Sequence, residues 1–315
     1  MRKNIIILII TAFSLAIAAT FLYFKNYSST LNSNEAVFKI ENNVIVSKIE
    51  INKNKQNVFY LKSNKNGWSY CDKFSTDKTL MHFLFQIIST IEVSSLVSEN
   101  ISQTIADSLT KKGHEVIIYD VNENKIKDYF IWANNHNHTT YAIMKNSSQP
   151  YIVKIPGYQG NFAGIFALSQ EEWYNKSLID FNPRDIKLIS FENLSNRALS
   201  FAIDFSNGQI PVLIDAKGQE VKYKKEAMQV YLNFLLKERL DMISFKNNIK
   251  QEKALYSIKI KTIQDKERSI TFFQQIPTNN TKPNTCLALI NDNITASFNS
   301  NNLDLIFRDI SFFIK

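Results

Sequence analysis

The sequence carries one order of apolar patterns twice, and this repetition is the feature that most constrains the fold. Seven apolar positions between Leu80 and Ile88 fall on apolar residues between Ala227 and Leu235 after a shift of 147. Other segments match in the same order. They are Val46–Ile51 with Ile186–Phe191; Val116, Ile118, Val121 and Phe130 with Ile258, Ile260, Ile263 and Phe272 at a shift of 142; and Tyr141–Met144 with Cys286–Leu289 at a shift of 145. Because the shift drifts, the pattern predicts two related units separated by small insertions and deletions.

Each unit is expected to combine an antiparallel sheet with helices, which gives an α+β fold class. In the first unit, alternating or β-branched runs predict strands over 44–51, 57–61, 116–120, 127–132, 140–145 and 151–155, and helical periodicity predicts helices over 77–93 and 98–112. Ser169 and Glu172 have capping-box spacing ahead of Trp173, which predicts a short helix there. We therefore expect a first unit at 36–168, a connector at 169–185 and a second unit at 186–315.

The N-terminus predicts a membrane anchor. Residues Ile5 to Phe24 carry no charge, Arg2 and Lys3 precede them, and Lys25 follows. Such a stretch is long enough for one transmembrane helix over residues 1–25, followed by a polar tether at 26–35. The positive flank places the N-terminus in the cytoplasm and the bulk of the chain in the periplasm or extracytoplasmic space, as a single-pass protein of the inner (cytoplasmic) membrane. The alternative is a signal peptide cleaved near Ala16–Ala18.

The charge and the cysteine content exclude few classes of protein. The net charge of +8 comes mainly from scattered lysines, which favours an anionic neighbour in the envelope but does not form the basic stripe of a nucleic-acid binder. We expect no nucleic-acid partner. Cys71 and Cys286 are compatible with a disulfide or with two thiols, and the sequence leaves both readings open.

No motif identifies catalytic or cofactor chemistry. His136 and His138 are two residues apart in a predicted loop, but a metal site needs further ligands that the sequence does not indicate. The chain has no G-x-S-x-G motif, and neither cysteine lies in a recognisable nucleophile context. The expectation is therefore no catalytic residue, no metal and no cofactor, although a fold can still assemble groups that are distant in sequence.

A glycine and aromatic loop is the strongest candidate for binding. Pro156 precedes Gly157, a pairing that suits a type II turn because glycine readily takes the positive φ required there. The candidate binding residues are Gly157, Tyr158, Gly160, Phe162 and Phe166. Their aromatic side chains either pack on the sheet or form a recognition surface.

Several of these segments together resemble the domain-of-unknown-function family 4340 of Bacteroidota. The resemblance rests on the N-terminal anchor, the 77–93 helix and a set of short motifs, clearest from Pro150 to Gly160: Asn66-Gly67-Trp68, Gly113 before Val116–Tyr119, Thr139–Met144, Pro150–Val153, Ile155–Gly160 and Glu171-Glu172-Trp173. It covers residues 40–191 by motif and the rest by architecture. The family implies no established enzyme activity, and some relatives resemble the extracytoplasmic part of auxiliary proteins of gliding-motility-type ABC transporters.

These observations predict a non-enzymatic accessory or scaffold protein of the cell envelope that joins an envelope protein complex. The resemblance adds a gliding-motility-type ABC transporter as a partner. The alternative is a cell-envelope hydrolase that acts on wall or glycan material, with carboxylates assembled from both halves of the chain.

Overall fold

The computed structural model describes residues 36–53, 57–65, 67–134, 138–206, 208, 210–245, 249, 253–273, 285–299 and 303–314. The predicted anchor and tether lie outside these residues. Within the described ranges, no helix is long and apolar enough to cross a membrane. Contacts divide the described chain into two compact units, one with residues 36–60 and 83–167 and one with residues 61–82 and 168–314.

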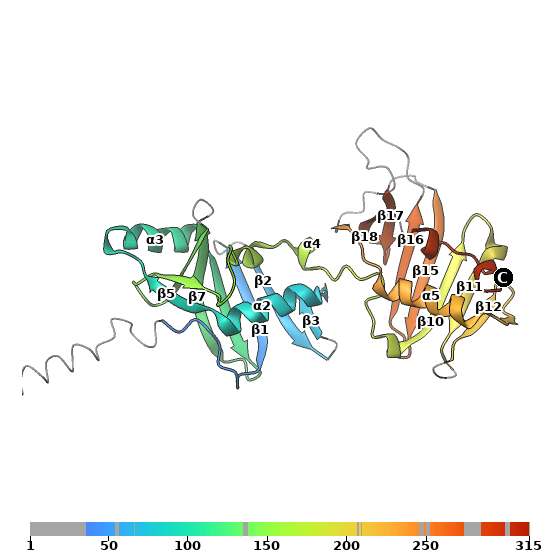
Figure 1. The fold of residues 1–315 in the computed structure, drawn as a ribbon, viewed down its shortest axis with the longest axis horizontal. Helices are drawn as coiled ribbons and strands as arrows, with labels where there is room; N and C mark the ends of the chain where they lie inside the picture. The colour runs from blue at the N-terminus through green and yellow to red at the C-terminus, as the bar shows by residue number, and fades with distance from the viewer. Residues whose placement is uncertain are drawn as a thin grey trace, which may run out of the picture. The chain divides into compact units, whose positions relative to one another are not determined.

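The chain forms two antiparallel sheets of nine strands each (Figure 1). The first has the order β4-β3-β2-β1-β6-β7-β8-β9-β5. Its strands are β1 (Val46–Lys53), β2 (Asn57–Asn64), β3 (Gly67–Tyr70), β4 (Phe74–Ser75), β5 (Glu92–Leu96), β6 (His114–Asp120), β7 (Lys125–Asn134), β8 (Thr139–Met144) and β9 (Tyr151–Lys154).

The second sheet has the order β13-β12-β11-β10-β15-β16-β17-β18-β14, which is the first order with each strand number raised by nine. Its strands are β10 (Ile186–Asn193), β11 (Phe201–Asp204), β12 (Val212–Asp215), β13 (Glu220–Val221), β14 (Met242–Ser244), β15 (Ala254–Thr262), β16 (Glu267–Phe273), β17 (Thr285–Ile290) and β18 (Ile294–Asn299). The two sheets therefore share one topology.

Within the described ranges the helices are few and mostly short. The longer ones are α2 (Lys78–Thr90), α3 (Glu99–Lys112) and α5 (Lys225–Lys237), and Figure 1 shows α2 across the first sheet and α5 across the second. Single turns form α4 (Gln170–Trp173), α6 (Leu303–Ile306), α7 (Ser311–Ile314) and the 3-10 segments η1 (Ala163–Ala167), η2 (Pro183–Asp185) and η3 (Arg197–Leu199). The capping box predicted ahead of Trp173 is present, with Ser169 and Glu172 bonding each other's backbone.

The predicted match between the two long helices is confirmed. Helices α2 and α5 each have 13 residues and begin 147 positions apart. Equivalent positions face the core in both: Met81 with Met228, Leu84 with Tyr231, and Ile88 with Leu235 are all at most 5% exposed. The apolar stripe at helical spacing is therefore what fixes each helix on its sheet.

Helix α2 ends earlier than predicted. It stops at Thr90 rather than Val93, because Glu92–Leu96 instead forms the edge strand β5 and pairs with β9. Val93, a β-branched residue, lies opposite Val153 in that pairing.

The central strand pairs of the two sheets share even the position of a register shift. In β1 with β6 the register shifts between Val46 and Lys48, and in β10 with β15 it shifts between Ile186 and Leu188, the positions 140 residues later. The predicted match of Val116 and Ile118 with Ile258 and Ile260 is confirmed by these pairings.

Two predicted matches are wrong by one residue. A bulge in β7 between Lys125 and Lys127 makes Ile131, not Phe130, the equivalent of Phe272. Ala142 pairs with Ile131 and Ala288 pairs with Phe272, so the match in this strand runs at a shift of 146 rather than 145. The predicted shift is wrong in β8 because Tyr141, Ala142 and Ile143 are all buried. A strand buried on both faces does not reveal its register.

The residue after α3, Gly113, must be glycine because there is no space for a side chain. A Cβ atom on Gly113 would lie 2.4 Å from the carbonyl oxygen of Leu109 and 2.8 Å from that of Ile131. Both neighbours are backbone atoms in a helix and a central strand, so neither can move without disturbing the sheet.

We expect Gly113→Ala to lower the free energy of unfolding by about 1–3 kcal/mol, the usual cost of forcing an atom into a packed site. Gly164→Ala is the matched control, because a Cβ there meets nothing within 4 Å. Equilibrium urea unfolding measures both. Equal stability of the two variants would contradict the close approach at Gly113.

Candidate functional site

The loop after β9 begins with the predicted turn. The backbone N–H of Tyr158 donates to the carbonyl oxygen of Ile155 at 3.1 Å, and Gly157 has a φ of 74°. Pro156 and Gly157 thus occupy the two central positions of a type II turn, as predicted. The turn ends at Tyr158.

The aromatic residues of this loop divide into two groups. Phe162 and Phe166 are 3% and 0% exposed, so they belong to the core, whereas Tyr158 remains 43% exposed. The Tyr158 ring lies 5.9 Å from the ring of Phe83 on α2, and a Cβ on Gly160 would come within 3.3 Å of it. Glycine at position 160 therefore lets the tyrosine ring approach the backbone of the loop closely.

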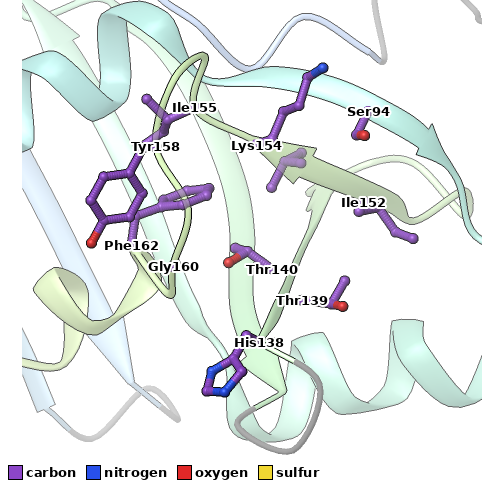
Figure 2. A pocket seen from close by; sticks show the side chains of 11 residues that line it. Ser94, His138, Thr139, Thr140, Ile152, Lys154, Ile155, Tyr158, Gly160 and Phe162 are labelled. Carbon is purple, nitrogen blue, oxygen red and sulfur yellow. The ribbon is translucent and has the colours of Figure 1, made fainter.

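A cavity of about 210 Å³ lies beside this tyrosine (Figure 2). Figure 2 shows the rings of Tyr158 and Phe162 on one side and His138 just before β8, with Thr140 between them and Thr139 farther from the rings. Its polar lining residues are Ser94, His138, Thr139, Thr140 and Lys154; the others are Ile152, Val153, Ile155, Tyr158, Gly160 and Phe162. Of the predicted binding residues, Tyr158, Gly160 and Phe162 therefore line one cavity, while Gly157 shapes the turn and Phe166 packs in the core.

Thr140 is the buried polar group of this cavity, and sequence reasoning did not single it out. Its side chain is 3% exposed, and among the described residues its hydroxyl has no hydrogen-bond partner. A buried hydroxyl without a partner costs about 1–3 kcal/mol, which a bound polar ligand would recover. No sequence signal marks it, because threonine is common in strands.

The charges at the cavity offset each other. The Lys154 ammonium lies 3.4 Å from a carboxylate oxygen of Glu92 on the neighbouring strand, and both side chains are about half exposed. His138 adds an imidazole at the rim in a left-handed backbone conformation with φ of 55°. A neutral ligand rich in hydroxyl or amide groups would suit a site with hydroxyls, an imidazole and an exposed tyrosine face.

The histidines do not form a metal site within the described residues, where no three His, Cys, Asp or Glu side chains are grouped. His136 lies outside those residues. The two cysteines, both described, form no disulfide.

A buried ionic network in the second compact unit also escaped sequence reasoning. The Asp180 carboxylate accepts hydrogen bonds from Ser75 and from the Asn175 amide, and Arg268 lies 3.8 Å away. Burial raises the pKa of Asp180, although Ser75, Arg268 and Asn175 each act to lower it. Arg268 is 5% exposed and also donates to the carbonyl oxygen of Ser177 at 3.1 Å. Since both carboxylate oxygens are already occupied, the network is built to hold chain segments together.

His114 is a half-buried titratable group in the first unit. It lies opposite Lys53 in the sheet, and its Nδ1 is buried without a partner among the described residues. Burial, and secondarily the charge of Lys53, lowers the pKa of His114 to about 4. The imidazole is therefore neutral in the folded protein at ordinary pH.

No family model, curated protein or solved structure matches the chain. The described residues define it only as a protein of two antiparallel sheets with a small cavity in the first unit. Its resemblance to domain-of-unknown-function family 4340 stays a prediction.

Replacing the unpaired hydroxyl should stabilise the protein. We expect Thr140→Val to raise the free energy of unfolding by about 1 kcal/mol, because it removes a buried polar atom at nearly constant shape. Thr76→Val is the matched control. The Thr76 hydroxyl is equally buried but donates to the carbonyl oxygen of Trp68 at 3.0 Å, so its loss should destabilise by about 1 kcal/mol. If urea unfolding shows both variants destabilised alike, the Thr140 hydroxyl has a partner.

His114 should make the protein acid-sensitive. The unfolded chain binds a proton at this residue below about pH 6.5, whereas the folded chain does so only near pH 4. The contribution of neutral His114 to the free energy of unfolding is fully present above about pH 6.5 and is lost as the pH falls toward 4. After allowance for partial solvent screening, we expect a loss of about 1–2 kcal/mol over this window that is absent in His114→Gln. Unfolding at a series of pH values measures it, with the exposed His82→Gln as the control that retains the wild-type profile.

Proposed function

We propose that the protein is a non-enzymatic accessory or scaffold protein of the cell envelope, whose first unit binds a partner at the cavity beside Tyr158. One observation carries the proposal: a buried hydroxyl without a partner, that of Thr140, lies in a cavity whose rim holds an exposed aromatic ring. Binding sites commonly combine a few directed polar groups with an apolar or aromatic wall.

The ligand that fits is a small uncharged polar group, such as a sugar hydroxyl or a peptide amide at the tip of a larger partner. A volume of about 210 Å³ holds only such a group, not a whole drug-sized molecule. The Thr140 hydroxyl would donate or accept one hydrogen bond, and the Tyr158 face would cover the apolar side of the ligand.

The N-terminal segment supports an envelope location in this proposal. We propose that residues 1–25 anchor the chain in the inner membrane, that 26–35 form a tether, and that the two sheets arose by internal duplication and lie in the extracytoplasmic space. The shared strand order supports the duplication. The resemblance described above suggests a gliding-motility-type ABC transporter as the complex that the protein joins.

The hydrolase alternative has no comparable support. Glycoside hydrolysis needs a pair of carboxylates at the substrate, and the residues that line the cavity include neither aspartate nor glutamate. Among the carboxylates that the structure describes, Asp180 has a raised pKa, but it belongs to the other compact unit and accepts hydrogen bonds from Ser75 and Asn175.

The test is chemical crosslinking of the full-length protein in its native membrane, followed by purification and quantitative mass spectrometry. We expect Tyr158→Ala to lower recovery of the wild-type partners by about tenfold or more, as loss of an aromatic anchor at the centre of an interface does. Val121→Ala, which truncates another exposed apolar residue of the same unit, should leave recovery unchanged. Equal recovery with Tyr158→Ala would remove the cavity from the function.

A further inference from the structure

The cavity beside Tyr158 opens where two neighbouring strands of the first sheet part. The pairing of β8 with β9 ends at Thr140 and Val153, which are both 3% exposed. Each strand continues for one residue on its other side, Thr139 of β8 paired with β7 and Lys154 of β9 paired with β5. The opening between Thr139 and Lys154 is therefore the entrance to the cavity, and the last pair lies at its inner end.

The equivalent strands of the second sheet stay paired beyond this point. The shift of 146 in this strand places Cys286 of β17 at the position of Thr140. From Cys286 the pairing of β17 with β18 continues for one further residue, to Thr285 opposite Asn299. The opening is therefore a property of the first sheet and not of the topology that the two sheets share.

The side chains at this pair of positions differ in the same sense. In the second sheet Cys286 lies opposite the fully buried Phe298, and its thiol donates to the carbonyl oxygen of Phe273 at 3.5 Å. In the first sheet the smaller Val153 lies opposite Thr140, whose hydroxyl has no partner among the described residues. The first sheet thus gives up packing volume and a hydrogen bond at one buried position. Local departures of this kind are expected at functional sites.

The polar groups around the opening favour an uncharged ligand that carries hydroxyls. Ser94 and Thr140 contribute hydroxyls to the lining, and a hydroxyl both donates and accepts hydrogen bonds. A ligand hydroxyl has the same two capacities, so it can bond Thr140 in either direction. The lining ammonium, that of Lys154, is already paired with Glu92, and the lining residues include no carboxylate. An ionised ligand would therefore lose its hydration without gaining a free charge as a partner.

The two aromatic rings of the lining indicate the shape of that ligand. Tyr158 is 43% exposed, whereas Phe162 is 3% exposed and closes the cavity toward the core. A sugar ring has C–H groups on its faces and hydroxyls around its edge, so it can pack on an aromatic ring and form hydrogen bonds sideways. An extended peptide instead presents a row of amide groups and requires a matching row along a strand edge. Thr140 offers a single hydroxyl, which suits the sugar.

We propose that the cavity binds one neutral sugar unit, with the sugar ring against Tyr158 and one of its hydroxyls bonded to the Thr140 hydroxyl. This inference rests on the proposed function, because it names the ligand of the same site. The volume of about 210 Å³ lies below the roughly 300–1,000 Å³ of sites for drug-sized ligands, which limits the ligand to about one sugar ring. Since no carboxylate lines the cavity, the site binds the sugar and does not cleave it.

The experiment is saturation-transfer NMR on the purified full-length protein in a detergent without a sugar headgroup, because a glycoside detergent would compete for the site. The probes are glucose, galactose, mannose and N-acetylglucosamine, each added separately. We expect at least one of them to bind with a Kd on the order of 1 mM, as a small ligand held by few contacts does. Preference for N-acetylglucosamine would indicate wall glycan as the source, and preference for a hexose would indicate another glycan.

Two variants separate a binding role from a structural one. Thr140→Val should weaken sugar binding about tenfold although it stabilises the fold, because it removes the hydrogen bond to the ligand at nearly constant shape. Tyr158→Ala should weaken binding by about tenfold or more. Val121→Ala, in the same unit and outside the lining, is the matched control and should bind as the wild type does.

Glucuronate and the peptide mimic N-acetylglycine methylamide are the competing probes. Binding of either one in place of the neutral sugars would overturn the inference. So would the absence of binding by every probe, or sugar binding that persists unchanged in both Thr140→Val and Tyr158→Ala. The proposed function is decided separately, because crosslinking of Tyr158→Ala records the recovery of a partner whatever the chemistry of the group in the cavity.

Discussion

The packing of one 13-residue helix on one face of a nine-stranded sheet is the constraint on which each half of this protein depends. The helix supplies Met81, Leu84 and Ile88 in one half, or Met228, Tyr231 and Leu235 in the other, and all six are buried. Each such side chain contributes roughly 1.5–3 kcal/mol by burial, enough to fix the sheet face that becomes core. The opposite face is then left to vary. It is covered by α3 in the first sheet, and it remains partly apolar without a described helix in the second.

Within the second compact unit, polar contacts fix segments that are far apart in the sequence. The backbone N–H of Asp77 donates to Trp173, that of Leu178 to Glu238 and that of Leu240 to Lys176, at 2.7–2.9 Å. Asp77 also caps α2 through the N–H groups of residues 79 and 80 and pairs with Arg239. The buried carboxylate of Asp180 and the guanidinium of Arg268 complete this arrangement. A largely buried ion pair of this kind adds little net stability, whereas removal of one partner alone would leave a costly unpaired charge.

The sequence alone was sufficient to predict the features that depend on a local pattern of residues. The stripe of α2 repeats in α5 at a constant shift, Pro156 and Gly157 specify their turn, and Ser169 and Glu172 specify their cap, because each signal is contained in a few neighbouring residues. The predicted match between strand residues was wrong where the local apolar pattern does not determine the register. The bulge in β7 added one residue, and β8 is apolar on both faces.

The candidate site was found only in part for a related reason. Tyr158 and its glycines stand out by composition, but Thr140 becomes notable only when its hydroxyl is seen buried without a partner. Asp180 meets Ser75 and Arg268 across long stretches of chain, and no spacing rule joins polar residues so far apart. No short segment of a single sequence reveals contacts between residues so far apart.

The assignment of residues 61–82 to the second compact unit has a practical consequence for anyone who divides the chain into expressible fragments. A fragment that ended near residue 168 would leave Ser75 without Asp180, Thr76 without its bridge to Tyr174, and Asp77 without Arg239. The complementary fragment would expose the other side of the same contacts, including the half-buried carboxylate of Asp180. No single cut point separates the halves cleanly, so the repeat visible in the sequence does not coincide with the pieces that can be handled alone.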